Sequence, residues 1–316
     1  MRNFILTVTV NPALDDIVEV SDFKRGQEYL SQAMQFNAGG KGINVARVLD
    51  RLGVRCVATG FCGGALGHVM QKLLDHEGIA HDFVAIKGST RSNLTVIEHK
   101  TNTITRIMHA GPRVTRQEVE RFKAKMRKLL KDCSFLVLSG RNALGVDDGL
   151  YVELIQMARP YRIPCFVDTH GRPLALALDA KPCCIKPNRE ETQELLGTKL
   201  NSERQLKEAL GYFLKRGVQH PIISLGKNGA IGSDGTNVWL AVPPELNYQN
   251  DVGSGDAFVG GFVYSLHKGK GFAESLRMAV AAGTANALNK QTVDFKKAQI
   301  LKLLEKVKVR RLVWKL

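Results

Sequence analysis

A short glycine-rich stretch, N-D-V-G-S-G-D-A-F at residues 250–258, combines an anion-binding backbone with a carboxylate. Gly253 and Gly255 allow backbone N–H groups to converge on an anion, and a helix expected from Asp256 onward adds its positive end. Such amides can stabilise a phosphoryl group in transfer, and Asp256 can take a proton from an attacking hydroxyl. We expect the helix end to favour the ionised carboxylate. Taken alone, the stretch fits a simple helix N-terminus with a tight turn equally well.

A second glycine cluster, N-A-G-G-K-G-I-N-V-A-R-V-L-D-R-L-G at residues 37–53, also leads into a helix. Gly39 and Gly40 would let a ligand approach the backbone closely. Lys41 can meet a phosphate as a point charge, and Asn44 can both donate and accept hydrogen bonds with sugar hydroxyls. The spacing does not match a P-loop, so this cluster predicts a sugar or phosphate site of another kind.

Strand-like and helix-like segments alternate around these clusters and must position them. Strands are expected at 4–10, 56–61, 134–139, 163–168, 182–186 and 221–225. Helices are expected at 43–52, 67–77, 115–131, 148–158, 202–216, 256–267, 272–288 and 295–307. This alternation predicts an α/β fold with a mostly parallel sheet covered on both faces. Ligands bind such sheets beyond the carboxyl ends of the strands.

The stretch 93–109 breaks this rhythm and is typical of a β-hairpin, with K-T-N at its turn. A further strand-like stretch, D-D-I-V-E-V at 15–20, can join it in a small separate sheet. Such a sheet could close over a ligand, and its open edge could pair with another subunit. An ordinary surface hairpin explains the pattern equally well.

Composition places the chain among ordinary globular proteins, since 44% of its 316 residues are hydrophobic and 24% are charged. No apolar run is long enough to span a membrane, and the N-terminus does not resemble a signal peptide, so we expect a cytoplasmic protein. The cysteines lack C-x-x-C spacing and are expected to be buried free thiols rather than zinc ligands. They are Cys56, Cys62, Cys133, Cys165, Cys183 and Cys184.

The net charge of +15 fits two kinds of partner, phosphorylated metabolites or nucleic acid. Much of the excess lies in residues 121–131 and 306–316. The first of these segments has helical spacing, with Phe122 and Met126 on one side, which favours a solvated helix face. The charge alone does not separate the two partner classes.

Both glycine clusters belong to a longer set of motifs in the same order along the chain. The others are N-P-A-L-D (11–15), T-G-F-C-G-G-A-L-G (59–67), K-G-S-T-R (87–91), I-K-P-N-R-E-E (185–191) and S-L-G-K-N-G-A (224–230). With these motifs the chain resembles the ribokinase/phosphofructokinase-B family of sugar kinases over essentially its whole length. Within the family it looks most like the 1-phosphofructokinases and tagatose-6-phosphate kinases.

The resemblance implies a three-layer, ribokinase-like α/β/α body with a mostly parallel central sheet and a small β-sheet lid. The body would comprise residues 1–9, 36–87 and 113–316, and the lid residues 10–35 and 88–112. It also implies transfer of a phosphoryl group from ATP to a sugar phosphate with the help of Mg²⁺, and a homodimer formed through the lid. No nucleic acid and no membrane would be involved.

Residue by residue, the resemblance places Asp256 as the catalytic base, with Gly253, Ser254 and Gly255 forming the anion hole. The sugar pocket would contain Asp15, Gly39, Gly40, Lys41 and Asn44. Arg91 would clamp the phosphate that the substrate already carries, since its planar fork suits that group. For ATP, Ser224, Gly226 and Gly229 match the nucleotide loop, and Asn286 falls where the family approaches adenine.

Asn188 and Glu191 match a family motif linked to Mg²⁺, with the carboxylate acting directly or through water. An Asn followed three residues later by a Glu also predicts a helix capping box. Both roles can hold at once.

Two loops depart from the family pattern. S-G-R-N-A-L-G at 139–145 has Arg141 and Asn142 where small residues and proline are common, and V-D-T-H-G at 167–171 has His170 where serine is common. Arg141 could add a substrate-phosphate contact or merely fill space, and His170 favours a structural role. These departures concern which sugar is bound.

The leading hypothesis is therefore an ATP-dependent kinase that converts fructose 1-phosphate to fructose 1,6-bisphosphate. Tagatose 6-phosphate is the closest alternative substrate. The alternative from a different class is a non-catalytic protein on a kinase fold that binds sugar phosphates or nucleic acid, which the positive charge motivates.

Overall fold

A ten-stranded central sheet dominates the computed structural model, which describes residues 3–30, 35–101 and 103–314. Seven neighbouring strands of this sheet are parallel to one another, and the three strands at one end are antiparallel. The order is β14 (Lys308–Leu312), β13 (Val238–Val242), β12 (Ala230–Ser233), β11 (His220–Ser224), β10 (Cys184–Ile185), β9 (Cys165–Asp168), β8 (Cys133–Ser139), β1 (Phe4–Thr9), β4 (Cys56–Gly63) and β5 (Val84–Ile86).

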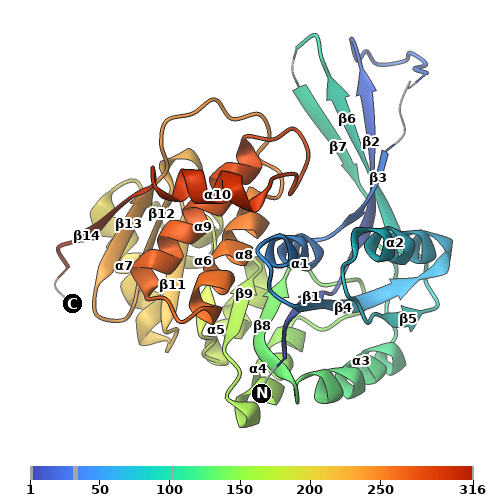
Figure 1. The fold of residues 1–316 in the computed structure, drawn as a ribbon. Coiled ribbons are helices and arrows are strands. Elements are labelled where there is room, and N and C mark those ends of the chain that lie inside the picture. The colour runs from blue at the N-terminus through green and yellow to red at the C-terminus, as the bar shows by residue number, and fades with distance from the viewer. Residues whose placement is uncertain (1–2, 31–34, 102, 315–316) are drawn as a thin grey trace.

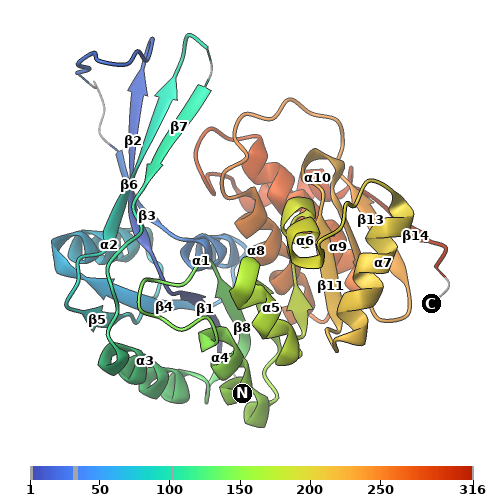
Figure 2. The same cartoon turned by 180° about the vertical axis from the view of Figure 1, so that it is seen from behind.

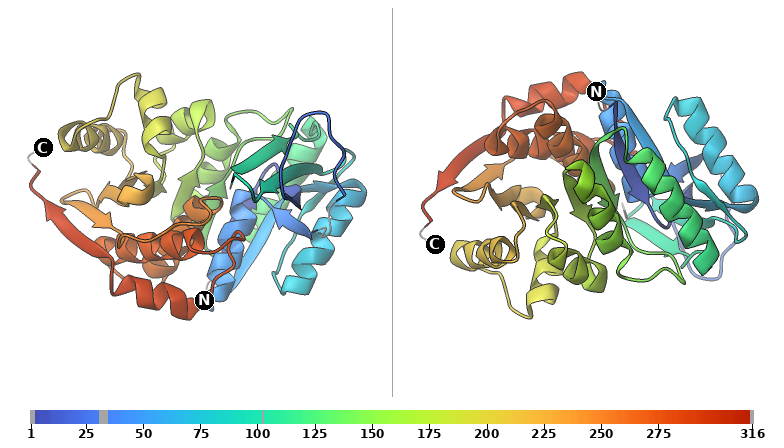
Figure 3. Two further views of the ribbon diagram at one scale, coloured as in Figure 1. Left: turned by 90° about the horizontal axis from the view of Figure 1, so that it is seen from above. Right: turned by 90° about the horizontal axis from the view of Figure 1, so that it is seen from below.

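Helices cover both faces of this sheet and give three layers (Figure 1, Figure 2). One face carries α1 (Lys41–Arg51), α2 (Gly64–Glu77), α8 (Ser254–His267), α9 (Phe272–Ala287) and α10 (Lys297–Leu304). The other carries α3 (Arg116–Leu129), α4 (Leu150–Ala158), α5 (Gly171–Asp179), α6 (Arg189–Leu196) and α7 (Glu203–Lys215). The views along the vertical axis in Figure 3 separate the two helical layers.

Alternation along the strands explains why the sheet is buried on both sides. In β8, Phe135 and Val137 pack into one apolar layer, while Leu136 and Leu138 pack into the other. Successive side chains of a strand point to opposite faces, so a continuous apolar run requires helices on both. The three-layer α/β fold with a mostly parallel sheet is therefore confirmed.

The small sheet projects from this body (Figure 1) and contains β3 (Gln35–Gly39), β2 (Ala13–Val20), β6 (Arg91–Glu98) and β7 (Thr103–Met108) in that order. β6 and β7 form the predicted hairpin, although Asn102 of its predicted turn lies outside the described residues. β3 pairs with β2, so the small sheet continues beyond residue 35, where the lid segment was predicted to end. The division into domains stays a prediction.

Every predicted strand and helix is present, with ends that differ by a few residues. The sequence analysis missed β3, β5, β12, β13, β14 and α5, and anticipated α6 only through its capping box. The last segment, 306–316, contains β14, whose residues Lys308 to Leu312 pair antiparallel with β13. The basic helix α3 buries Phe122 and Met126 and exposes most of its cationic residues, as predicted.

The six cysteines are free thiols, five of them buried and Cys183 half-buried, which confirms their predicted state. Within the described part of the chain, no helix is both long enough and apolar enough to cross a bilayer.

The first prediction concerns Phe262 of α8, which is fully buried between the rings of Phe166 and Phe272. Phe262→Ala should lower the free energy of unfolding by about 3–5 kcal/mol, because it removes apolar contacts and leaves a cavity. Urea unfolding followed by circular dichroism measures this change. Leu301→Ala, at a position 44% exposed, should cost less than about 1 kcal/mol. Equal losses in the two variants would contradict this account of the core.

Candidate active site

Asp256 is buried, with 5% of its surface exposed, in the first turn of α8. The helix begins after Gly253, whose φ of 77° favours glycine. The amide nitrogen Nδ2 of Asn44, from α1, donates a hydrogen bond to Oδ2 of Asp256 at 2.8 Å. Residues far apart in the sequence thus meet at the start of two helices, as the two glycine clusters predicted.

Two glycines in the run V-G-G-F allow α8 to approach its neighbours. A Cβ on Gly260 would lie 2.6 Å from the side chain of Val48 in α1. A Cβ on Gly261 would lie 2.8 Å from atoms of Met278 and Ala282 in α9. Larger side chains would push the helices apart, so these glycines fix the distance between Asp256 and Asn44.

Burial raises the pKa of Asp256 from its ordinary value of 3.8 to about 6, against the lowering effects of Lys41 and the hydrogen bond from Asn44. The charge of Asp168 adds to the increase. Desolvation exceeds the contributions that favour the ionised form, which the sequence analysis did not anticipate. A carboxyl with a pKa near 6 is well matched to accept a proton near neutral pH.

A buried carboxylate, Asp168, holds two lysines beside Asp256. Its oxygens lie 3.1 Å from Nζ of Lys41 and 3.0 Å from Nζ of Lys186. Burial alone would raise the pKa of Asp168, but the two lysines lower it to about 2, and Asp168 in turn raises the pKa of Lys41. A Cβ on Gly255 would lie 3.6 Å from Nζ of Lys186, so this ammonium group faces the glycine turn.

Sequence reasoning did not assign Asp168 or Lys186 to the site. Asp168, in V-D-T-H-G, is the last residue of β9, and Lys186, in I-K-P-N, directly follows β10. The ends of these two neighbouring strands meet at the same edge of the sheet. A charged residue directly after an apolar strand of a parallel sheet was the available signal. We add both to the candidate site.

Arg47 fixes Asn44 in position from the next turn of α1. It donates to Oδ1 of Asn44 at 2.9 Å, to the carbonyl oxygen of Ala38 at 2.6 Å and to both oxygens of Glu77. The Asn44 oxygen is therefore occupied, so its Nδ2 must face Asp256 as a donor.

Asp15 of β2 and Gly39 of β3 lie side by side on the small sheet. A Cβ on Gly39 would overlap the Asp15 carboxylate, and Asn93 donates to this carboxylate at 2.8 Å. Burial raises the pKa of Asp15. Gly40 precedes α1 with a φ of 132°. Asp15 and Gly39 thus lie together, and Gly40 directly precedes Lys41 in the chain; their role as a sugar pocket stays a prediction.

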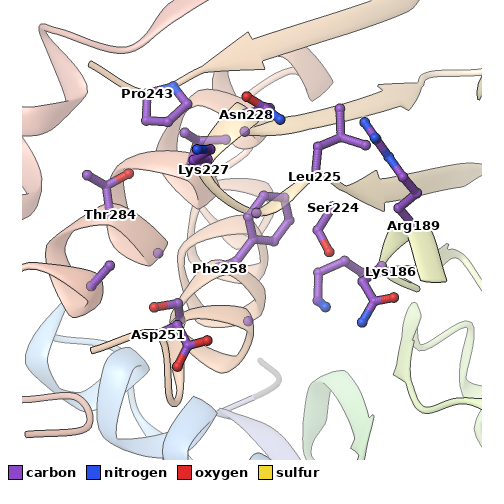
Figure 4. Close-up of a pocket in the computed structure, with 18 of the residues that line it drawn as sticks. Lys186, Arg189, Ser224, Leu225, Lys227, Asn228, Pro243, Asp251, Phe258 and Thr284 are labelled. Atoms are coloured by element: carbon purple, nitrogen blue, oxygen red, sulfur yellow. The ribbon is translucent and has the colours of Figure 1, made fainter. Parts of the chain in front are cut away.

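A cavity of about 730 Å³ adjoins the start of α8 (Figure 4). Ser224, Gly226 and Gly229, the predicted nucleotide loop, line it together with Lys227. Figure 4 shows Lys186, Arg189 and Ser224 on one side and Thr284 on the other. Phe258, Val280, Pro243, Ala287 and Tyr248 form the apolar part of the lining, which also contains the charged Lys41, Glu190, Glu191 and Asp251. Charged and apolar groups together suit a ligand with phosphates and a flat ring.

Asn286 is fully buried, although the sequence placed it near adenine. Its Nδ2 donates to the carbonyl oxygen of Val252 at 2.7 Å and to the Ser254 hydroxyl at 3.0 Å. Its Oδ1 accepts from the backbone N–H of Val293 at 2.6 Å. With its amide engaged in this way, Asn286 supports the glycine turn, and we replace its proposed contact with adenine by this positioning role.

Asn188 and Glu191 form the predicted capping box of α6. The backbone N–H of Asn188 donates to Oε2 of Glu191 at 2.8 Å, and Oδ1 of Asn188 accepts from the N–H of Glu191 at 2.7 Å. The other carboxylate oxygen of Glu191, Oε1, takes no part in the capping box and lies 4.0 Å from Nδ1 of His170. The described residues contain no group of three or more His, Cys, Asp or Glu side chains that could hold a metal ion by themselves.

The two loops that depart from the family pattern, 139–145 and 167–171, contain Arg141, Asn142 and His170. Burial, followed by the charge of Arg141, lowers the pKa of His170, and Glu191 opposes the shift. His170 is the residue before α5, its side chain makes no capping hydrogen bond there, and its structural role stays a prediction. Asn142 donates to the carbonyl oxygen of Asp147 at 3.1 Å within its own loop.

Comparison with known proteins gives a family for this arrangement. Residues 8–298 match the model of the pfkB family carbohydrate kinases. The chain is 35% identical to a 1-phosphofructokinase of Borreliella burgdorferi over 308 residues, 96% of this chain and 98% of the relative. It is 32% identical to a tagatose-6-phosphate kinase of Staphylococcus epidermidis over 291 residues, 91% of this chain and 93% of the relative.

A solved structure has the same fold. It is phosphofructokinase-2 from Escherichia coli in complex with fructose-6-phosphate. The TM-score is 0.88 at 29% identity, covering 96% of this chain and 98% of the other.

The pKa of Asp256 predicts how stability depends on pH. The carboxyl holds its proton more tightly in the folded protein, so its contribution to stability is lost as pH rises from about 4 through about 6. Asp256→Asn, which stays neutral, should therefore stabilise the protein at pH 8 by about 1–3 kcal/mol, and by less at pH 5. Urea unfolding at both pH values measures this. Exposed Asp132→Asn is the control, and equal gains at both pH values would contradict the assignment.

Proposed function

Because the chain belongs to the pfkB family of carbohydrate kinases, we propose that it transfers the γ-phosphoryl group of ATP to a hydroxyl group of a ketohexose phosphate. Fructose 1-phosphate, giving fructose 1,6-bisphosphate, is the first choice of substrate. The observation that supports this proposal is buried Asp256, hydrogen-bonded to Asn44 and next in the chain to Gly255, which lines the cavity. Tagatose 6-phosphate is the second candidate, since one relative is named for that activity.

In this proposal Asp256 accepts the proton of the attacking sugar hydroxyl. Asp15 and Asn44 hydrogen-bond the sugar, and Arg91 binds the phosphate it already carries. The backbone N–H groups around Gly253, Ser254 and Gly255 stabilise charge on the transferring group, with Lys186 beside them. Positioning and charge stabilisation supply most of the rate, because phosphoryl transfer needs little covalent chemistry from the protein.

ATP would occupy the cavity, with its phosphates toward Lys186 and its base against the apolar wall. Mg²⁺ fits this site only together with ATP, since the ion commonly takes one or two carboxylates, waters and substrate phosphates. Glu191 would contribute Oε1, directly or through water, while Asn188 orients it through the capping box. When bound, the ion would neutralise phosphate charge.

A non-catalytic or nucleic-acid-binding role has little support. Family membership, the intact glycine turn and Asp256 favour an enzyme, and a positive surface also suits phosphorylated substrates. The cytoplasmic location stays a prediction.

A coupled assay of ATP consumption tests the function. We expect turnover with fructose 1-phosphate to exceed that with tagatose 6-phosphate, fructose 6-phosphate and free fructose. Phosphorus NMR of the product identifies the hydroxyl that is phosphorylated. Turnover with none of the sugar phosphates would overturn the proposal.

Asp256→Asn separates chemistry from binding. Loss of the base should lower kcat by about 10²- to 10⁴-fold, because the amide cannot accept the proton. Calorimetric Kd values for ATP and the sugar phosphate should change by less than about threefold. The same Asp132→Asn control should leave kcat unchanged, and near-normal kcat for Asp256→Asn would refute the base assignment.

We further propose that two copies associate through their small sheets. β7 is an edge strand on which every residue from Thr103 to Met108 is exposed, including Ile104, Ile107 and Met108. An exposed apolar edge favours pairing with another chain. Light scattering should report a dimer for the wild type and a shift toward monomer for Ile107→Lys. A wild-type monomer at all concentrations would remove this proposal.

A further inference from the structure

Two neighbouring cysteines, Cys183 and Cys184, lie at the start of β10, and the proposed reaction uses neither of them. Successive side chains of an extended strand point to opposite faces, which would separate two adjacent thiols. Here the chain bends at Cys183, two residues after Lys181 with its φ of 52°, and the strand starts only at Cys184. The two sulfur atoms lie 3.6 Å apart, and the Cys184 thiol donates a hydrogen bond to the Cys183 sulfur.

The two thiols differ in exposure and in acidity. Cys184 is fully buried, whereas Cys183 is half-buried, so a small molecule from solvent meets Cys183 first. Burial raises the pKa of Cys184, and the hydrogen bond that Cys184 donates lowers the pKa of Cys183. The thiolate is the nucleophilic form of cysteine, so the accessible member of the pair is also the more reactive one.

Three other cysteines lack this combination. Cys56, Cys62 and Cys165 are buried, and burial raises the pKa of each. Each of their thiols donates to a backbone carbonyl oxygen rather than to another sulfur. They pack as small apolar residues of the core. A reactive thiol beside a second thiol is thus a property of the β10 start that these three do not share.

β10 connects this pair directly to the candidate active site. It is a strand of two residues, paired with β9 on one side and β11 on the other. The backbone N–H of His220 donates to the carbonyl oxygen of Cys183 at 2.8 Å. Lys186, whose Nζ lies 3.0 Å from Asp168 and faces the glycine turn, is only two residues beyond Cys184. A twist of the backbone at the cysteines therefore reaches Lys186 over a very short length of chain.

We propose that Cys183 and Cys184 form a reversible modification site for small-molecule disulfides, and that its closure loosens β10 beside Lys186. The Cys183 thiolate attacks one sulfur of a disulfide RSSR, which forms a mixed disulfide at Cys183 and releases one thiolate RS⁻. The sulfur of Cys184 then attacks the Cys183 sulfur, which forms the Cys183–Cys184 disulfide and releases the second RS⁻. Two protein thiols are oxidised, one disulfide is reduced, and the two protons lost by the cysteines give two RSH.

The adjacency of the two residues makes this disulfide easy to reverse. Their Cα atoms are about 3.8 Å apart across a trans peptide, less than the roughly 4.4 Å at the lower end of ordinary disulfides. Such a departure stores strain, and strained disulfides are the readily reduced, regulatory ones. Closure must also twist the peptide between the two residues, so the hydrogen bond from His220 to the Cys183 carbonyl is lost and β10 shifts.

Oxidised glutathione in excess, added to the native protein, tests the site by mass spectrometry. The wild type should lose the mass of two hydrogen atoms and yield a peptide with a Cys183–Cys184 disulfide, and dithiothreitol should reverse this. Cys184→Ser should stop at the mixed disulfide, with one glutathione on Cys183. Cys183→Ser should react at least about tenfold more slowly, because the remaining thiol is buried.

Cys56→Ser is the matched control, since it removes a buried thiol at the start of another strand, β4. It should close the disulfide like the wild type. Absence of both the disulfide and the glutathione adduct in the native wild type would overturn the site. So would a Cys183→Ser variant that reacts as fast as Cys184→Ser.

Hydrogen exchange tests the effect on β10. In the oxidised wild type the amides of His220 and Lys186 should exchange at least about tenfold faster than in the reduced protein, because their acceptors at Cys183 and Val167 move. Cys183→Ser treated in the same way should show no change. Equal exchange in the oxidised and reduced wild type would overturn the link to Lys186.

The site itself does not depend on the proposed kinase function, and only its effect on turnover rests on that function. An active wild type should lose about 3- to 30-fold in kcat on oxidation and regain it with dithiothreitol, whereas oxidant-treated Cys183→Ser should keep its kcat. An active enzyme with unchanged kcat after closure would overturn the link to the active site. If the reduced wild type shows no turnover, the proposed function fails, and the mass and exchange measurements still decide the modification site.

Discussion

The close packing of α8 against α1 and α9 is the constraint on which the site depends. It brings Asp256 within 2.8 Å of Asn44 and removes the carboxylate from water, which raises its pKa to about 6. Gly260 and Gly261 make this approach sterically possible. A helix N-terminus in open solvent would hold a weaker base, so proton acceptance near neutral pH follows from packing as much as from residue type.

Charge in this crowded region is balanced by Asp168. A single buried carboxylate between Lys41 and Lys186 keeps both ammonium groups at fixed positions, with Lys41 in the cavity lining and Lys186 toward the glycine turn. Two unpaired lysines this close would repel each other and lose pre-organisation. The site can therefore present two cations to phosphates without unfolding the edge of the sheet that carries them.

Local sequence patterns predicted much of this arrangement, because they describe short-range physics. The glycine turn before Asp256, the capping box of Asn188 and Glu191, and the hairpin at 93–109 are each encoded within a few residues. The roles of Asp168 and Asn286 depend on partners that are distant in the chain, such as Lys41 for Asp168 and Val252 for Asn286. Their types are compatible with many environments, and only the fold decides which one they occupy. The raised pKa of Asp256 was missed for the same reason, since burial is a tertiary property.

The architecture explains why the substrate side and the ATP side can be tuned separately. Residues that face the cavity come from strand ends and helices of the rigid body, whose strands are hydrogen-bonded on both sides. Residues proposed for the sugar side come partly from the small sheet, which is linked to the body by four chain segments; Arg91, at the start of β6, donates hydrogen bonds to two of the others. If the proposed assignment holds, an arginine at position 141 would add charge on the sugar side without altering the glycine turn or Asp256. Differences among relatives in which sugar phosphate they bind can thus arise at the four linking segments and their adjoining loops, while the chemistry at α8 stays the same.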